Sequence, residues 1–290
     1  MQTLLYAIGG LIVAYLLLSL VFTYLVQEYP RKPFYDPPDW GRVTDARIAT
    51  AEGGRLEVWR IDPDGPSRGI VVLAHGWGRN RDRMVQRARY FGCWGFTCVI
   101  HSARDHGRSS PRRFMNAARM AEDIEAVLKW VGAPVLLYGH SAGACAAILA
   151  AHRHPERVRL LFLEACYADT REALLSLYRW FNRYFGMVFG PLIVFWMNLF
   201  YRNQLKDVSP GRLAPSLQMP VMIIHGADDR RFPVDFAFKL KACFPPGRVE
   251  LFVAPGARHS ESSFDPAYPG AVREFIGRYL EGRQDGGGNT

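Results

Sequence analysis

The stretch PVLLYGHSAGACAAILAAHRH, residues 134–154, decides how this chain folds. Its beginning, PVLLY, is a short apolar run typical of a strand buried on both faces, and its continuation, ACAAILAAH, is typical of a helix. Between the two stands GHSAG at residues 139–143, a G-x-S-x-G pattern in a strand–turn–helix context. The glycines leave room for a strained turn that exposes Ser141, and the helix beginning at Ala142 aims its amide groups at a developing negative charge. The pattern predicts that Ser141 is a nucleophile.

Strand-like and helix-like segments alternate on both sides of this stretch. Strands are predicted at residues 47–50, 55–61, 69–74, 96–100, 134–138, 158–163, 221–224 and 249–253. Helices are predicted at residues 81–91, 116–131, 142–154, 235–243 and 266–280. Repeated βα units predict the α/β class, with a mostly parallel sheet flanked by helices on both faces.

A serine hydroxyl needs a base and an orienting acid before it can act as a nucleophile. His259 lies on the loop after the last predicted strand, and Asp229 follows the strand before it. Because these loops open at the carboxyl edge of the sheet, where the GHSAG turn also lies, the sequence predicts a triad of Ser141, Asp229 and His259. Asp228 and Glu164 remain alternative acids.

An oxyanion hole needs two hydrogen-bond donors. The backbone N–H of Ala142 is one candidate, because it begins the helix after the nucleophile. The backbone N–H of Trp77 is the other, because HGWG at residues 75–78 forms a glycine-lined turn after a predicted strand. The alternative for this turn is a tight connection with a packing tryptophan.

The alternation stops between residues 163 and 221, and a mostly helical insertion is predicted at about residues 166–215. It contains the uncharged run 185–201, interrupted by Gly190 and Pro191. The insertion is expected to form a lid, with an interfacial helix or a second membrane span as alternatives. Its large aromatic side chains are expected either to line an acyl pocket or to lie against a bilayer: Phe181, Phe185, Phe189, Phe195, Trp196 and Phe200.

The amino-terminal residues 4–26 carry no charge and are apolar all round. As a helix they would span about 34 Å, enough for a hydrocarbon core of ~30 Å. No Lys or Arg precedes the run and no small-residue cleavage site follows it, so residues 1–27 are predicted to be a retained single-pass anchor rather than a signal peptide. The positive-inside rule favours a cytoplasmic catalytic domain. It rests on three basic residues after the run: Arg31, Lys32 and Arg42.

The remaining boundaries follow from composition. Residues 28–46, rich in proline and aromatic residues, are expected to be a tether, residues 47–282 the α/β domain, and residues 283–290 a disordered tail. The net charge of +9 includes no run of five like charges, which argues against a nucleic-acid partner. The five cysteines show no metal spacing and are expected to be free thiols, with no metal and no cofactor.

Taken together, HGWG at 75–78, GHSAG at 139–143, HGADD at 225–229 and the late His259 resemble the α/β-hydrolase superfamily, in particular its esterases and monoglyceride-lipase-like enzymes. The resemblance covers about residues 47–280. It implies a Ser-Asp-His triad, no cofactor, and hydrolysis through an acyl-enzyme.

One segment departs from the family pattern D-x-R-G-H-G-x-S. Residues 102–109 carry Ser102 in place of the aspartate and Asp105 in place of the first glycine, which blurs the subfamily more than the chemistry. Because Ser141 is not a carboxylate, epoxide hydrolase and dehalogenase activities are disfavoured.

The expected function is therefore that of a serine hydrolase at a membrane. Its expected substrates are small-molecule or lipid-like carboxylic esters with apolar acyl chains. A thioesterase or an acyltransferase would use the same triad. A non-catalytic binding module at the membrane is the alternative from another class.

Overall fold

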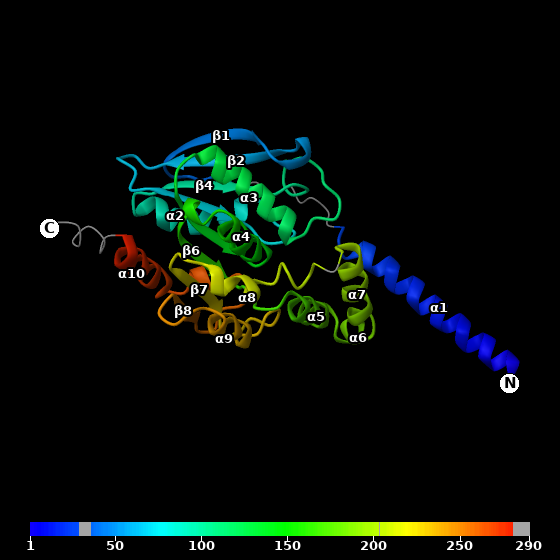
Figure 1. The fold of residues 1–290 in the computed structure, drawn as a ribbon. Coiled ribbons are helices and arrows are strands. Elements are labelled where there is room, and N and C mark those ends of the chain that lie inside the picture. Colours follow the sequence, from blue (N-terminus) through cyan, green and yellow to red (C-terminus); the bar gives the residue numbers. More distant parts are fainter. Residues whose placement is uncertain (29–35, 203, 281–290) are drawn as a thin grey trace.

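In the computed structural model, which describes residues 1–28, 36–202 and 204–280, an amino-terminal helix precedes a sheet with helices on both faces (Figure 1). The strands are β1 (Arg42–Ala49), β2 (Arg55–Asp62), β3 (Ile70–Ala74), β4 (Thr97–His101), β5 (Val135–His140), β6 (Val158–Glu164), β7 (Val221–Gly226) and β8 (Val249–Ala254). The helices are α1 (Gln2–Leu25), α2 (Val85–Cys93), α3 (Ala117–Val131), α4 (Ala142–Arg153), α5 (Thr170–Phe181), α6 (Arg183–Val188), α7 (Gly190–Phe200), α8 (Pro210–Leu213), α9 (Asp235–Ala242) and α10 (Tyr268–Leu280).

The sheet has eight strands in the order β1-β2-β4-β3-β5-β6-β7-β8. The strands from β3 to β8 run parallel, whereas β1 and β2 form an antiparallel hairpin at one edge. Because the strand order reverses between β3 and β5, the loops after these strands diverge at the carboxyl edge and leave a crevice there. The predicted α/β fold is confirmed.

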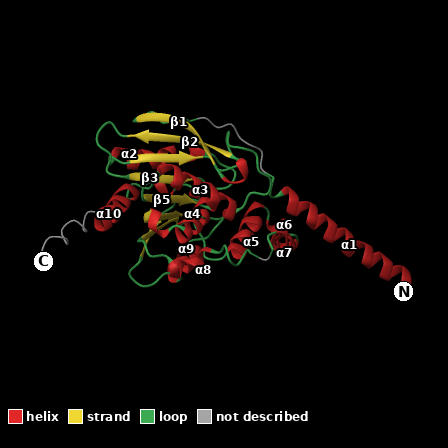
Figure 2. Cartoon of the chain, turned by 45° about the horizontal axis from the view of Figure 1, so that its top comes forward, coloured by secondary structure: helices red, strands yellow, loops and turns green. Residues whose placement is uncertain are grey.

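Helices lie on both sides of the sheet (Figure 2). Successive side chains of the parallel strands enter two different cores. In β5, Leu137 belongs to the core that also contains residues of α3, α4 and α9, whereas its neighbour Tyr138 belongs to the core with α2 and α10 on the other face. A strand with a helix layer on each side has no polar face, which explains the continuous apolar runs in the sequence.

The first strand begins earlier than the sequence indicates. β1 starts at Arg42, within the predicted tether 28–46, and pairs with β2 from Arg42 opposite Asp62 to Ala49 opposite Arg55. Most of its side chains are exposed, so backbone pairing rather than apolar burial defines this edge strand. The boundary of the tether is corrected accordingly. Residues 29–35 of the tether and the predicted tail 283–290 lie outside the described residues.

The insertion between β6 and β7 contains α5, α6, α7 and α8. The uncharged run breaks into α6 and α7 at Phe189, because Pro191 in the first turn of α7 has no N–H to continue the preceding helix. An 11-residue helix such as α7 is about 17 Å long, too short to cross a bilayer. Among the described helices, α1 is the one long and apolar enough to do so.

Candidate active site

The backbone around Ser141 forms a sharp turn between β5 and α4. Ser141 has φ 55° and ψ −120°, a strained conformation held by the hydrogen bond that its N–H donates to the carbonyl oxygen of Glu164, 2.8 Å away. A Cβ atom at Gly139 would lie 2.4 Å from the oxygen of Gly143, and one at Gly143 would lie 2.4 Å from the oxygen of His75. Only glycine fits at these two positions.

The structure brings the three predicted triad residues together at the carboxyl edge of the sheet. His259, on the loop between β8 and α10, has its Nε2 atom 3.0 Å from Oγ of Ser141. Its Nδ1 atom lies 2.7 Å from Oδ2 of Asp229, on the loop after β7. Both His259 and Asp229 are buried. A hydroxyl, an imidazole and a carboxylate in this order can move a proton from the serine to the histidine.

The carboxylate of Asp229 is fixed by its own loop as well. Its Oδ1 atom accepts hydrogen bonds from the backbone N–H groups of Arg231 and Phe232, at 2.8 and 3.1 Å. Burial by itself raises the pKa of Asp229, but the hydrogen bond and charge of His259 outweigh it, and the pKa lies below its ordinary value. Asp229 is therefore ionised at neutral pH and holds the Nδ1 side of His259.

Neither alternative acid is placed to do this. Asp228 is exposed. Glu164 is fully buried, but it is paired with Arg87, whose Nη2 atom lies 2.5 Å from Oε1, and it accepts a hydrogen bond from Tyr138 at 2.7 Å. Although burial raises the pKa of Glu164, Arg87 more than offsets this and lowers it to about 2.

The neighbouring histidines hold loops rather than the serine. Nε2 of His140 lies 3.1 Å from the carbonyl oxygen of His259, and burial lowers the pKa of His140 to about 3, which keeps it neutral. Nε2 of His75 accepts a hydrogen bond from the N–H of Ala103, and Nε2 of His106 accepts one from the N–H of Gly78. These bonds fix the loop after β3.

The two residues expected to form the oxyanion hole lie beside the nucleophile. Ala142 is the first residue of α4, where the helix dipole is positive. Trp77 lies on the loop after β3, and this loop passes close to the nucleophile. A Cβ atom added at Gly76, the residue before Trp77, would lie 3.1 Å from Cβ of Ser141. Trp77, Ala142, Ser141 and His259 line one cavity.

This cavity has a volume of about 380 Å³ and a mainly apolar wall. The insertion supplies much of the wall through Leu174, Leu177 and Tyr178 of α5 and Met197 of α7. The six aromatic residues singled out in the sequence do not line it, and Phe181, Phe195 and Phe200 are exposed instead. Sequence periodicity did not separate the inner from the outer face of the uncharged run 185–201, because that run is apolar on both.

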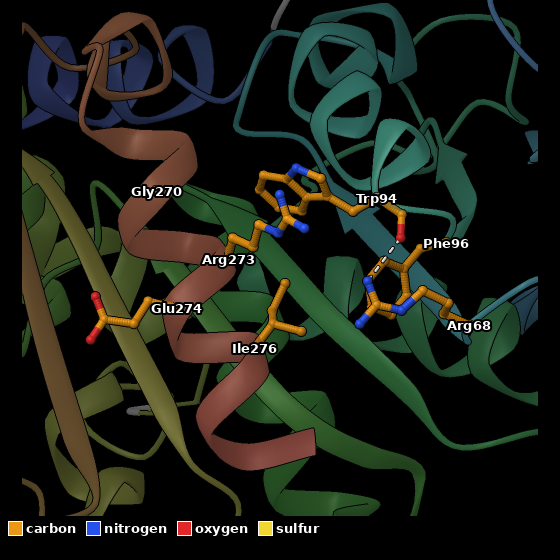
Figure 3. A pocket seen from close by; sticks show the side chains of 7 residues that line it. All are labelled: Arg68, Trp94, Phe96, Gly270, Arg273, Glu274 and Ile276. Carbon is orange, nitrogen blue, oxygen red and sulfur yellow. Dashed lines mark hydrogen bonds between the residues drawn. The ribbon is translucent and has the colours of Figure 1, made fainter. Parts of the chain in front are cut away.

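A second cavity, of about 320 Å³, lies at the opposite, amino edge of the sheet (Figure 3). Arg68 before β3 and Trp94 and Phe96 before β4 face Arg273 of α10 across it. The guanidinium of Arg68 lies over the Phe96 ring and donates to the carbonyl oxygen of Trp94, 3.1 Å away. This cavity is separate from Ser141. Among the described residues, no group of three His, Cys, Asp or Glu side chains is placed to hold a metal ion.

Several residues around the site were missed by sequence reasoning. Arg79 and Arg231 line the catalytic cavity, and the Arg231 guanidinium stacks 4.1 Å from the centre of the Trp180 ring. Ser102, the departure from the family pattern, donates a hydrogen bond to Glu57 at 2.6 Å and so keeps this loop tied to β2. Such pairs join distant segments, so no local sequence signal could have identified them.

Comparison with known proteins agrees with this architecture. A family model described as "Serine aminopeptidase, S33" matches residues 65–209, half of the chain. The lysophosphatidylserine lipase ABHD12 of Macaca fascicularis is 25% identical over 78% of this chain, which spans only 60% of that lipase. The monoacylglycerol lipase of Mycolicibacterium smegmatis is 24% identical over 70% of this chain and 84% of its own length. The esterase Pf2001 of Pyrococcus furiosus shares the fold, with a TM-score of 0.68 at 18% identity, over 87% of this chain and 99% of the esterase.

Proposed function

The chain belongs to the serine aminopeptidase S33 family and is an ester-hydrolysing enzyme of the α/β-hydrolase fold, and from this premise we propose that Ser141 attacks carboxylic esters of apolar, lipid-like acyl chains. The observation that carries the proposal is the pair of contacts made by His259 at the wall of an apolar cavity. Its Nε2 atom lies 3.0 Å from Oγ of Ser141, and its Nδ1 atom lies 2.7 Å from Oδ2 of Asp229.

The reaction follows from these positions. Nε2 of His259 takes the proton as Oγ of Ser141 attacks the ester carbonyl, and Asp229 stabilises the imidazolium that forms. The N–H groups of Trp77 and Ala142 receive the charge on the carbonyl oxygen. His259 then protonates the leaving alcohol, and the acyl group stays on Ser141. A water molecule, deprotonated by His259, releases the acid and restores the serine.

The charge of the cavity favours esters over the peptides that the family's description suggests. An aminopeptidase substrate presents an α-ammonium group, which is largely protonated at neutral pH and needs an anionic partner. None of the described residues that line the cavity is acidic, and two of them, Arg79 and Arg231, carry positive charge. Like charges in a partly desolvated cleft repel, so an amino terminus is poorly accommodated there.

The size and polarity of the cavity support an acyl chain as the bound group. A volume of about 380 Å³ lies within the range of small-molecule sites, which are mainly apolar with a few polar groups that orient the ligand. The two lipase relatives act on single-chain lipid esters by name, and such a substrate has one acyl chain to place beside Leu174 and Leu177.

The same proposal places the enzyme at a membrane. α1 has 24 residues and no charged side chain, and its amino-terminal part makes the exposed end of the molecule (Figure 1). We take α1 as a single-pass anchor. The basic residues just after it favour a catalytic domain on the cytoplasmic side.

Turnover of p-nitrophenyl esters from acetyl to dodecanoyl tests this function. Medium and long chains are expected to be preferred over acetyl, and leucine p-nitroanilide is expected to be a poor substrate. Leu177→Trp, which fills the cavity, is expected to lower kcat/KM for the long ester about tenfold or more. Leu199→Trp, at an exposed position of the same insertion, is the matched control and is expected to leave it unchanged. A preference for acetyl esters, or for the anilide, contradicts the proposal.

A further inference from the structure

The carboxyl-terminal part of α1 and the turn directly after it carry one polar stripe. Ser19, Thr23 and Gln27 are buried, whereas the side chains of residues 1–18 are all exposed. These three residues recur every fourth position and therefore share one face of the helix. Ser19 and Thr23 donate to backbone oxygens of the preceding turn, and Gln27 donates to the oxygen of Thr23 at 2.7 Å. A buried polar face is not needed in a helix that serves only as a tether, so this face indicates a contact with another part of the protein.

This face is covered by the insertion. Nε1 of Trp196 in α7 donates to Oγ of Ser19 at 2.8 Å, and the hydroxyl of Tyr201 donates to Oε1 of Gln27. The Phe22 ring packs edge-on against Phe189, with ring centres 4.8 Å apart. Where water is scarce, side-chain hydrogen bonds between helices hold them together. Figures 1 and 2 both show the end of α1 lying against α7.

The turn directly after α1 reaches the catalytic cavity. Val26 and Gln27 line it together with Ser141 and His259. Met197 of α7, which also lines it, belongs to a small core that includes Val26 and Phe22 at its edge. The cavity wall is thus continuous from the nucleophile to the anchor.

The outer surface of the insertion near α1 is apolar and uncovered. The large side chains there have exposed fractions of 49% to 79%, and they belong to α6 and α7: Tyr184, Met187, Val188, Phe195, Leu199 and Phe200. A soluble surface rarely carries so large an apolar patch without a partner. Because α1 is apolar enough to enter a bilayer and lies against α7, a lipid surface is the partner that this patch fits.

We propose that α1 and the turn directly after it form a specificity element of the enzyme: Val26 and Gln27 of this turn form one wall of the acyl site, and the acyl chain enters from the bilayer along the contact between α1 and α7. The inference rests on the proposed function, because it takes an acyl chain as the ligand. Val26, directly after α1, is then the residue that meets the chain, and the Ser19–Trp196 and Gln27–Tyr201 hydrogen bonds keep it in place.

A pair of adjacent substitutions in the full-length protein, reconstituted in phosphatidylcholine vesicles, tests this directly. Val26 is half-buried at the cavity, whereas its neighbour Leu25 is exposed. Val26→Trp is expected to lower the ratio of kcat/KM for dodecanoyl over acetyl p-nitrophenyl ester about tenfold or more. Leu25→Trp is expected to keep the wild-type ratio. An unchanged ratio in Val26→Trp, or an equal fall in Leu25→Trp, overturns the proposal.

A second measurement does not depend on turnover or on tolerance of a tryptophan. Ser141→Ala protein in the same vesicles is irradiated with a fatty acid that carries a diazirine in mid-chain, and the cross-linked peptides are mapped. Cross-links on Val26 or Gln27 and on Met197 are expected. Cross-links on neither Val26 nor Gln27 contradict the inference, whatever the labelling of the exposed part of α1. If Val26 or Gln27 and Met197 are cross-linked but the wild-type protein hydrolyses no ester, the proposed function fails while the acyl site stands.

Discussion

Arg87 of α2 and Glu164 at the end of β6 form a fully buried ion pair beside the catalytic loops. The Nη2 atom of Arg87 lies 2.5 Å from Oε1 of Glu164 and also donates to the carbonyl oxygen of Ser260 at 3.1 Å. Since Ser260 follows His259, the pair ties the end of a central strand to the loop that carries the base. Glu164, one of the alternative acids, thus holds the scaffold.

Glu164→Gln is expected to destabilise the fold. The substitution leaves the buried Arg87 guanidinium without its counter-charge, which typically costs about 3–5 kcal/mol, whereas replacing both partners by apolar residues is often nearly neutral. The free energy of unfolding in urea is the measurement, and the double variant Arg87→Met/Glu164→Leu is the control. A loss below about 1 kcal/mol in the single variant would count against this role.

The same pair makes a pH-dependent contribution. The pKa of Glu164 is about 2 in the folded state, against an ordinary value of 4.5, so the ionised form of Glu164 stabilises the fold. This contribution is complete above pH 4.5 and is lost as the pH falls from there toward 2. The gap in unfolding free energy between wild type and Glu164→Gln is therefore expected to narrow as the pH falls from about 4.5 toward 2. A gap that stays constant over this interval would show that Glu164 does not titrate this way.

Asp229→Asn is expected to reduce kcat by about 10⁴, because an amide no longer selects the His259 tautomer that accepts the serine proton. Asp228→Asn changes an exposed neighbour and is the matched control, expected to leave kcat within about twofold. Steady-state hydrolysis of a p-nitrophenyl ester measures both. Equal losses in the two variants would mean that the wrong carboxylate has been assigned to His259.

Cys93 offers a test of membrane orientation. It is exposed at the end of α2, whereas Cys98, Cys145 and Cys166 are buried. If the catalytic domain faces the cytoplasm, a membrane-impermeant maleimide is expected to label Cys93 only after cells are opened. The Cys93→Ser variant is expected to lose most of the maleimide labelling, which shows that the label is attached to Cys93. Labelling of Cys93 in intact cells would place the domain on the outer side.

The fold and the positions of the site residues could be predicted because short stretches of sequence determine them. Residues 139–143 predict a tight turn because only glycine fits on either side of Ser141, and the structure has that turn. Asp229 and His259 were predicted at the carboxyl edge because each follows a short apolar run, and parallel strands end at the same edge. Their geometry now agrees with that placement, while their catalytic roles remain proposals.

The contacts that the sequence did not predict join segments far apart in the chain. Ser19 and Trp196 are 177 residues apart, and Arg87 and Glu164 are 77 apart. Neither pair leaves a local pattern, because no residue near either partner in the sequence indicates which distant residue it contacts. The prediction for the aromatic side chains of the insertion failed for a different reason. The uncharged run 185–201 is apolar on both faces, so its periodicity does not say which side chains meet α1 and which line the cavity.

Covalent labelling of Ser141 tests the central claim most directly. Purified protein is treated with a fluorophosphonate, which reacts with an activated serine, and the modified peptide is identified by mass spectrometry. Wild-type protein is expected to carry a single adduct on Ser141, and Ser141→Ala is expected to carry none while unfolding at the wild-type temperature. Full labelling of Ser141→Ala, or an adduct on another serine of the wild-type protein, would contradict the assignment of Ser141 as the nucleophile.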